Sequence, residues 1–250
     1  MLLAFVAPLG LIIGSFLNVV AYRLPRGESI VKPRSRCTTC GTEVRALDNI
    51  PLLSWLVLRG RCRHCKAQIS PRYPAVELVT GIVFALVAVA RGPEPELLLD
   101  LPFAAMLIAV ADIDIEHKIV PNRILAPMAV WGVAASAVVR PDKLPELVIA
   151  GAAAFTFLLL AALIHPAGMG LGDVKLAGVM GLYLGLPVTA AMLIAFFAGS
   201  LVGIGIMLRH GAGARKRGVP FGPFLALGGL VALVAGHDLV HLYAQTFLSR

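Results

Sequence analysis

Long apolar segments separated by short polar ones follow one another along almost the whole chain. Most of these segments approach the roughly 20 residues that a helix needs to cross a membrane. We therefore predict an all-α polytopic membrane protein with about eight transmembrane helices, or seven if two segments form one re-entrant unit. The apolar segments cover residues 2–21, 75–90, 97–111, 122–139, 145–164, 174–185, 187–208 and 221–247.

One of these segments, 174–185, is too short for an ordinary span. At about 1.5 Å per residue it covers only some 18 Å. Either it pairs with its neighbour as a re-entrant unit, or it begins inside the bilayer. The second arrangement would place Asp173 below the lipid surface.

The composition agrees with the membrane interpretation. Hydrophobic residues make up 58% of the 250 residues and charged residues 14%, whereas a soluble domain has about 45–50% and 25%. The first apolar segment has no basic stretch before it and no small-residue cleavage site after it. We therefore interpret it as a retained helix and not as a secretory signal.

The net charge of +8 follows the topology of the chain. Eleven of the 22 Lys and Arg residues lie in 22–73. If the helices alternate in direction, the loops at 112–123, 165–175 and 209–220 lie on the same side and raise that count to 18. An excess of Lys and Arg marks the cytoplasmic side of a membrane protein. The distribution predicts a cytoplasmic 22–73 loop and gives no support for a nucleic-acid partner.

All four cysteines lie in that loop, in "RCTTCG" and "RCRHCK". Two C-x2-C pairs separated by 21 residues supply four thiolate ligands for a tetrahedral ion. The reducing cytosol disfavours stable disulfides, although two labile redox pairs without a metal remain the alternative. We predict a closed structural metal site, with zinc as the ion, formed by Cys37, Cys40, Cys62 and Cys65.

Acidic residues border two of the apolar segments. "ADIDIEHKIVPN" carries Asp112 and Asp114 where the third segment ends, and "GMGLGDVK" carries Asp173 after Gly170 and Gly172. Singly, Asp173 fits a helix N-cap and the other two fit a solvated membrane surface. Together, acids at the ends of membrane segments indicate a functional site. Helix alternation places them at the same cytoplasmic end, and the glycines allow a substrate strand to approach the backbone.

Two carboxyl groups that share one proton can cleave a peptide bond. The ionised group deprotonates a water molecule, and the protonated group donates to the scissile carbonyl. This aspartic-protease chemistry requires neither a metal nor a covalent intermediate.

Several ordered motifs resemble the bacterial prepilin peptidases, the type IV leader peptidases among the "GxGD" membrane aspartic proteases. The similarity covers most of the chain. The motifs are "GSFLNVVAYRLPRGES", "CTTC", "NIPLLSWLVLRGRCRHC", "ISPRYPAVELVTG", "DIDIEHKIVPN", "GMGLGDVKLAG" and "VPFGPFLALGG".

The resemblance implies two catalytic residues. The first aspartate of the family lies seven positions before a proline, which gives Asp114 here, and the second is Asp173 of the GxGD motif. Asp112 is the alternative to Asp114, and we favour Asp114. Asn122 stands where many relatives have an aspartate, but that position is not the catalytic one.

The resemblance also implies the substrate and the cofactor. Substrates are type IV prepilins and type II secretion pseudopilins, cut after a glycine at the cytoplasmic face of the bacterial inner membrane. Relatives with the cysteine loop also methylate the new N-terminus from S-adenosylmethionine, so we expect both activities. Glu77 in "YPAVELVTG" is a candidate for substrate positioning or methyl transfer, or else pairs with the dipole of its helix.

The predicted domains are a first helix at 1–21, a four-cysteine metal-binding loop at 22–73 and a peptidase bundle at 74–250. Two other classes of function remain as alternatives. Paired intramembrane acids also serve proton- or cation-coupled transporters, but the repeated halves common in transporters are not found in this sequence. In the other alternative, the protein is an assembly scaffold whose metal loop docks a partner.

Overall fold

The structure, a computed structural model, describes residues 1–165, 169–210, 219–243 and 245–246. The regular elements in these ranges are helices, and the only extended pairing among them is two isolated β-bridges. The predicted all-α class is therefore confirmed. The chain divides into two compact units, Met1–Pro93 and Glu94–Arg250, which are described in turn.

The first unit is built on a close pair of long helices, α1 (Leu2–Arg23) and α3 (Arg72–Arg91). Glycines on α1 let the two backbones touch: a Cβ added at Gly10 would lie 2.8 Å from the Cα of Gly81, and one added at Gly14 would lie 2.7 Å from the Cα of Glu77. Small residues at such a contact are typical of helix pairs in membranes.

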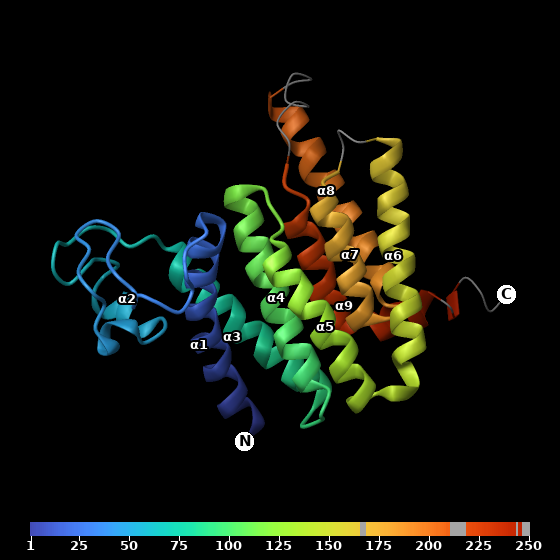
Figure 1. Cartoon of the computed structure of the whole chain (residues 1–250), viewed down its shortest axis with the longest axis horizontal. Helices are drawn as coiled ribbons and strands as arrows, with labels where there is room; N and C mark the ends of the chain where they lie inside the picture. Colours follow the sequence, from blue (N-terminus) through green and yellow to red (C-terminus); the bar gives the residue numbers. More distant parts are fainter. Residues whose placement is uncertain (166–168, 211–218, 244, 247–250) are drawn as a thin grey trace. The chain divides into compact units, whose positions relative to one another are not determined.

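The segment between α1 and α3 forms a loop with three short helices. These are η1 (Leu24–Arg26), η2 (Ala46–Asn49) and α2 (Leu53–Val57). The loop leaves the end of α1 and returns to the start of α3, and α2 lies beside the C-terminal half of α1 (Figure 1).

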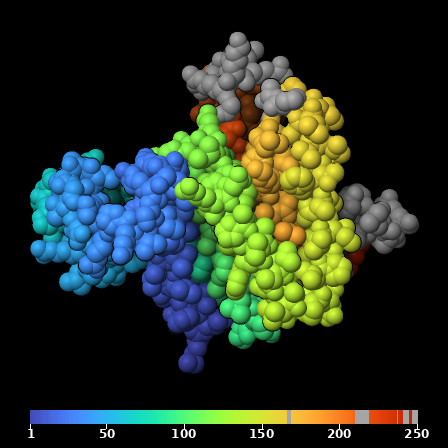
Figure 2. Space-filling view, in the orientation of Figure 1, coloured from blue at the N-terminus to red at the C-terminus, as the bar shows by residue number. Residues whose placement is uncertain are grey.

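The second unit surrounds one central helix, α4 (Leu97–His117), which packs against its neighbours α5, α7 and α9. α6 covers α7, and α8 covers α9. In Figure 2 the orange surface of α7 lies between the surfaces of α5 and α6. The remaining helices of this unit are α5 (Asn122–Val139), η3 (Pro141–Lys143), α6 (Leu144–Ile164), α7 (Leu171–Leu184), α8 (Val188–His210) and α9 (Gly222–Tyr243).

The helices of the second unit alternate in direction. One end of the unit therefore holds the last turns of α4, α6 and α8 together with the first turns of α5, α7 and α9 (Figure 1). Among the described residues this end carries the basic side chains Lys118, Arg123, Lys175 and Arg209 together with the acids Asp112, Asp114, Glu116 and Asp173. The opposite end carries Arg140 and Lys143 together with the acids Glu94, Glu96, Asp142 and Glu146.

Each predicted apolar segment corresponds to one helix, and the largest difference is at the end of α4, which continues to His117 and not to 111. α7 begins at Leu171 and not at 174. By length and composition, five of the described helices can cross a membrane: α1, α3, α5, α6 and α8. α4 carries four acidic residues, and α7 has only 14 residues, about 21 Å. The chain is a multi-pass membrane protein, and the count of about eight spans stays a prediction.

Candidate functional site

Asp114 lies in the last turn of α4 and is 5% exposed. Its Oδ2 accepts a hydrogen bond of 3.0 Å from the backbone N–H of Gly222, the first residue of α9. The first N–H groups of a helix have no partner within the helix. Asp114 therefore accepts a hydrogen bond from an N–H group that has no partner within α9, although Asp114 and Gly222 are far apart in sequence.

Asp173 lies in the first turn of α7 and is 8% exposed. The N-cap residue of α7 is Gly170, three positions earlier, so Asp173 is not the N-cap. Its carboxylate instead accepts a hydrogen bond from the backbone N–H of Gly170. This resembles the second half of a capping box, in which the third helical residue reaches back to the cap.

The two carboxyl groups occupy the same end of the second unit, close enough for the charge of Asp114 to act on Asp173. Asp112, two residues earlier on α4, is also buried at 8% exposure and contacts other groups. Of the two α4 aspartates, Asp114 is the one whose charge acts on Asp173. The choice of Asp114 over Asp112 as the catalytic residue stays a prediction.

The glycine of the motif next to Asp173 has a packing role. A Cβ added at Gly172 would lie 2.8 Å from the Cβ of Val120, in the connection between α4 and α5. The absence of a side chain lets the start of α7 contact the segment that follows Asp114. At Gly170 a Cβ would lie 3.5 Å from Oδ2 of Asp173 and meet no other side chain.

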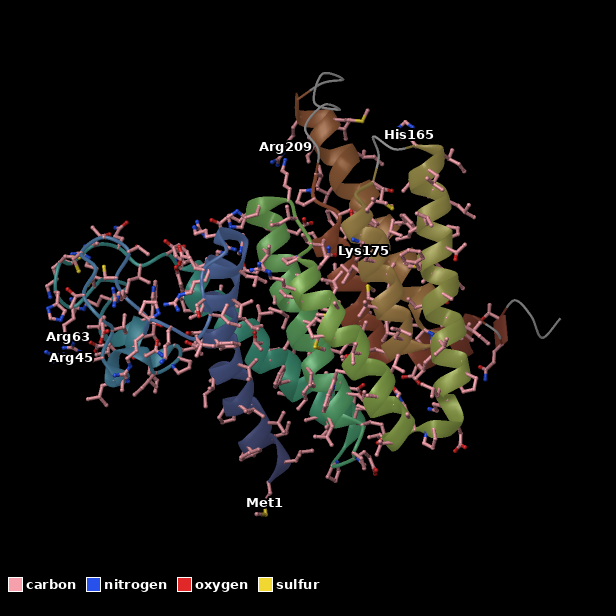
Figure 3. All side chains as sticks on the ribbon, in the orientation of Figure 1. Met1, Arg45, Arg63, His165, Lys175 and Arg209 are labelled. Carbon is pink, nitrogen blue, oxygen red and sulfur yellow. The ribbon has the colours of Figure 1, made fainter. Side chains whose placement is uncertain are left out.

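Lys175 ties α7 to the start of α5. Its Nζ donates a hydrogen bond of 3.2 Å to Oδ1 of Asn122, the residue after Pro121. Figure 3 shows Lys175 on α7, together with Arg209 and His165 at the ends of α8 and α6. Three of the Lys and Arg residues counted in the 209–220 loop, Arg215, Lys216 and Arg217, lie outside the described residues.

The four cysteines of the loop form one cluster. Their sulfur atoms all lie within 4.8 Å of one another, and the Sγ atoms of Cys37 and Cys65 are 3.8 Å apart. Tetrahedral coordination with Zn–S distances of about 2.3 Å requires sulfur separations of about 3.8 Å. The cluster of Cys37, Cys40, Cys62 and Cys65 therefore could hold a metal ion of this kind.

Two turns of the same form build this cluster. In the first, the N–H of Cys37 donates to Thr42 O and the N–H of Gly41 donates to Cys37 O. In the second, Cys62 and Lys66 repeat these bonds, and Gly41 and Lys66 both have positive φ.

The Thr42 side chain lies 3.4 Å from the Cys40 sulfur and lowers the pKa of that thiol to about 6. Backbone N–H groups of Cys65 and His64 lower the pKa of Cys62. The thiolate, the form that binds metal, is thus favoured at Cys40 and Cys62. Desolvation and the neighbouring cysteine side chains instead raise the pKa of Cys65 to about 11.

Glu77 of α3 and Arg23 of α1 hold the loop, and Asn18 of α1 joins that helix to Tyr73 in the first turn of α3. Glu77, 9% exposed, accepts a 2.8 Å hydrogen bond from the N–H of Leu52. Asn18 donates to Tyr73 O at 3.0 Å, and Arg23 donates to the backbone oxygens of Ser29 and Arg34. Glu77 therefore positions the residue before α2, and its role toward a substrate stays a prediction.

Sequence reasoning missed four of these residues: Asn18, Arg23, Val120 and Gly222. Polar side chains within an apolar helix were a usable signal for the first two. The glycine between two prolines in "VPFGPF" indicated a helix start near Gly222 but not its partner.

The fold and these sites define a class: a multi-pass membrane protein with paired buried acids and a four-cysteine loop. Two family models match the chain, the "Bacterial Peptidase A24 N-terminal domain" over residues 9–91 and the "Type IV leader peptidase family" over residues 101–208. The chain belongs to the type IV leader peptidase family.

Curated relatives agree over almost the whole chain. A protein of Aeromonas hydrophila is 35% identical over 270 residues, with 95% of this chain and 92% of the relative covered. One of Bacillus subtilis (strain 168) is 37% identical over 243 residues, with 96% of each covered. Both are named prepilin leader peptidase/N-methyltransferase, so the transporter alternative is not favoured. No solved structure gave a significant match.

Proposed function

We propose that this protein removes the short basic leader of type IV prepilins and type II secretion pseudopilins by cutting after a glycine, with Asp114 and Asp173 as the catalytic pair. The observation that carries the proposal is the meeting of these two buried carboxyl groups, held by separate helices, at one end of the second unit. Relatives with 35–37% identity bear the name of this activity.

The chemistry follows from one proton shared by two carboxyl groups. The ionised group takes a proton from a water molecule, whose oxygen attacks the glycine carbonyl carbon, while the other group donates its proton to the carbonyl oxygen. The tetrahedral intermediate then collapses and the C–N bond breaks. The leaving amine takes the proton that came from water, and a hydroxyl of the intermediate returns its proton to the group that had protonated the carbonyl oxygen. Each carboxyl group returns to its starting state.

Gly222, Gly170 and Gly172 serve this reaction by placing the pair. Gly222 holds the Asp114 carboxylate through its N–H, and Gly172 lets α7 approach the segment after Asp114. We also retain the prediction that Gly170 and Gly172 receive the substrate strand, because Gly170 is exposed beside Asp173.

The charge pattern supports an orientation in the bacterial inner membrane. Among the described residues, the end of the second unit that holds the aspartates carries four Lys and Arg residues against two at the opposite end, and Lys and Arg accumulate on the cytoplasmic side. The cysteine loop is the most basic segment of the chain. We therefore place the active site and the loop in contact with the cytoplasm, where the leader of the substrate lies.

Zinc is the metal we propose for Cys37, Cys40, Cys62 and Cys65. Four thiolates close its coordination sphere, so it stabilises the loop and takes no part in hydrolysis. The N-methyltransferase name of the relatives supports S-adenosylmethionine as a second ligand, which supplies a methyl group to the new N-terminal amine. The Glu77 carboxylate already accepts a hydrogen bond from the Leu52 N–H. We therefore assign Glu77 no step of the methyl transfer and retain it as a positioning residue that acts through the loop.

The test uses the purified full chain in detergent and a synthetic prepilin with a basic leader, a glycine and an apolar helix. Cleavage is followed by mass spectrometry for Asp114→Asn, Asp173→Asn and Asp112→Asn. Asp142→Asn, an exposed acid at the opposite end of the second unit, is the matched control. Adding S-adenosylmethionine tests for a product heavier by one methyl group.

We expect the first two variants to lose cleavage while Asp112→Asn and Asp142→Asn retain it. Full cleavage by both Asp114→Asn and Asp173→Asn would contradict the aspartic mechanism and would favour the transporter alternative. Loss in Asp112→Asn with retention in Asp114→Asn would move the catalytic role to Asp112.

A further inference from the structure

The short helix α2 buries its polar side chain and exposes its apolar ones, the reverse of a helix that packs on a protein core. Its polar residue Ser54 is buried and bonds to the backbone of Leu47 and Ile50. The apolar residues at spacing i, i+3, i+4 point outward: Leu53 is 59% exposed, Leu56 62% and Val57 77%. Leu47, which precedes α2, is 78% exposed. These four side chains form an apolar surface that no described residue covers.

The level of α2 along the α1–α3 pair indicates what covers that surface. Tyr22 lies in the last turn of α1 and Tyr73 in the first turn of α3, and both are partly exposed. Tyrosine is enriched where a membrane helix meets water, so these two residues mark the interface. Arg26 lies 4.0 Å above the ring of Tyr22, as expected for a cation at that level.

α2 is held at this interface and not beyond it. Glu77, which binds the N–H of Leu52, is five residues into α3. At about 1.5 Å per residue it lies about 8 Å along the helix from its first residue, on the membrane side of Tyr73. In Figure 1, α2 accordingly lies alongside α1 and not past its end. Interfacial helices bury their apolar faces about 5–10 Å into the boundary between headgroups and acyl chains.

Cations lie next to the apolar surface. A surface hollow is lined by Leu58, Arg59, Arg61, Cys62 and Lys66. Arg59, Arg61 and Lys66 are exposed, whereas the nearby Arg63 is paired with Asp48 at 2.6 Å. Arg45 lies with Arg63 on the side of the loop away from α1 and α3 (Figure 3). The hollow therefore offers three cations beside an apolar helix face, a combination that suits the phosphate of a lipid and its chains.

We propose that α2 lies in the membrane interface, with Leu53, Leu56 and Val57 among the acyl chains and Arg59, Arg61 and Lys66 bound to the phosphate of an anionic phospholipid. The hydrogen bonds of Glu77 and Arg23 to the loop fix this depth. The proposal concerns the loop alone and does not depend on the peptidase activity.

The first experiment measures depth. Leu56→Trp is made in a Trp131→Phe background, and the protein is reconstituted into vesicles of phosphatidylcholine with phosphatidylglycerol, with and without bromine on the acyl chains. Bromine quenches tryptophan only at close range. The background protein, which keeps Trp55, gives the baseline, and Glu43→Trp, an exposed site in the first metal-binding turn, is the matched control. Bound zinc is measured in each variant to show that the loop is folded.

We expect brominated lipid to quench the Leu56→Trp signal well beyond both controls. Equal quenching of Leu56→Trp and Glu43→Trp in zinc-loaded protein would overturn the proposal. Protection from both brominated lipid and aqueous iodide would also overturn it, because a second copy, another part of the chain or a protein partner would then cover α2.

The second experiment measures the headgroup contact. Native mass spectrometry counts the phosphatidylglycerol that stays bound to the wild type and to the triple variant Arg59→Asn, Arg61→Gln, Lys66→Asn. Asparagine is chosen at 59 and 66 because both positions have positive φ. Each cation strengthens contact with an anionic membrane by about fivefold, so the triple variant should lose the bound lipid. Arg36→Gln, in the other metal-binding turn, is the control. Equal retention by wild type and triple variant, or equal binding of free phosphate and lipid by the wild type, would contradict the proposal.

Discussion

The backbone N–H of Gly222 donates a 3.0 Å hydrogen bond to Oδ2 of Asp114, a residue 108 positions earlier in the chain. A Cβ at position 222 would lie 2.7 Å from the same oxygen. The start of α9 therefore holds the Asp114 carboxylate by a hydrogen bond, and the carboxylate fits there because residue 222 has no side chain.

Gly222→Ala should displace the Asp114 carboxylate and reduce kcat for prepilin cleavage by about 100-fold, the cost of a misplacement of about 1 Å at a catalytic group. Peptide cleavage by mass spectrometry gives the rate, and circular dichroism in detergent reports the fold. Gly205→Ala is the matched control, since a Cβ there meets nothing within 4 Å. Unchanged kcat in Gly222→Ala would show that Gly222 does not position Asp114.

Gly172→Ala should also slow cleavage, because the new Cβ would lie 2.8 Å from the Cβ of Val120 and push α7 away. The double variant Gly172→Ala, Val120→Gly removes the contacting carbon and should recover most of the rate. The measurement is kcat for the two single variants and the double one. No recovery in the double variant would mean that Gly172 acts on the substrate directly and not through packing.

Glu77→Gln should keep the loop in place, because its amide oxygen still accepts the Leu52 N–H, whereas Glu77→Ala should release α2. Limited proteolysis of the loop separates the two outcomes, and parallel cleavage and methylation assays show which activity depends on loop position. Loss of methylation in Glu77→Gln with an intact loop would show that the charge of Glu77 matters beyond this hydrogen bond.

Cys37→Ser and Cys62→Ser should each lose the bound zinc, because a closed tetrahedral site needs all four sulfurs. The loop, rich in Lys and Arg, should then become sensitive to trypsin. Atomic spectroscopy gives the zinc content, and chelator-treated wild type should show the same sensitivity. Thr38→Ala, an exposed position between Cys37 and Cys40, serves as the control. Undiminished zinc in both cysteine variants would exclude this cluster as the metal site.

Tyr183→Phe tests the far side of the second unit. The Tyr183 hydroxyl donates a 2.6 Å hydrogen bond to Met128 O, and its ring stacks on Phe103 at 4.5 Å between centroids. The variant should lower the free energy of unfolding by about 1 kcal/mol and leave kcat unchanged. Thermal unfolding in detergent and the cleavage assay measure the two quantities. A large fall in kcat without loss of stability would contradict a purely structural role.

The sequence by itself determined the features that depend on neighbouring residues. Apolar runs near membrane length located the long helices, because each helix satisfies its own backbone hydrogen bonds. The spacing within "CTTC" and "CRHC" predicted the metal cluster, because each cysteine pair is arranged by its own turn.

Tertiary structure alone decided which distant groups meet. The sequence offered both Asp112 and Asp114, and only the packing of α4 against α7 and α9 brings Asp114 to Gly222 and into range of Asp173. The tertiary structure also places the Glu77 carboxylate at the Leu52 N–H and leaves the leucines of α2 exposed. These contacts join residues from separate helices and loops, so side-chain shape and burial select them, and no local pattern records that selection.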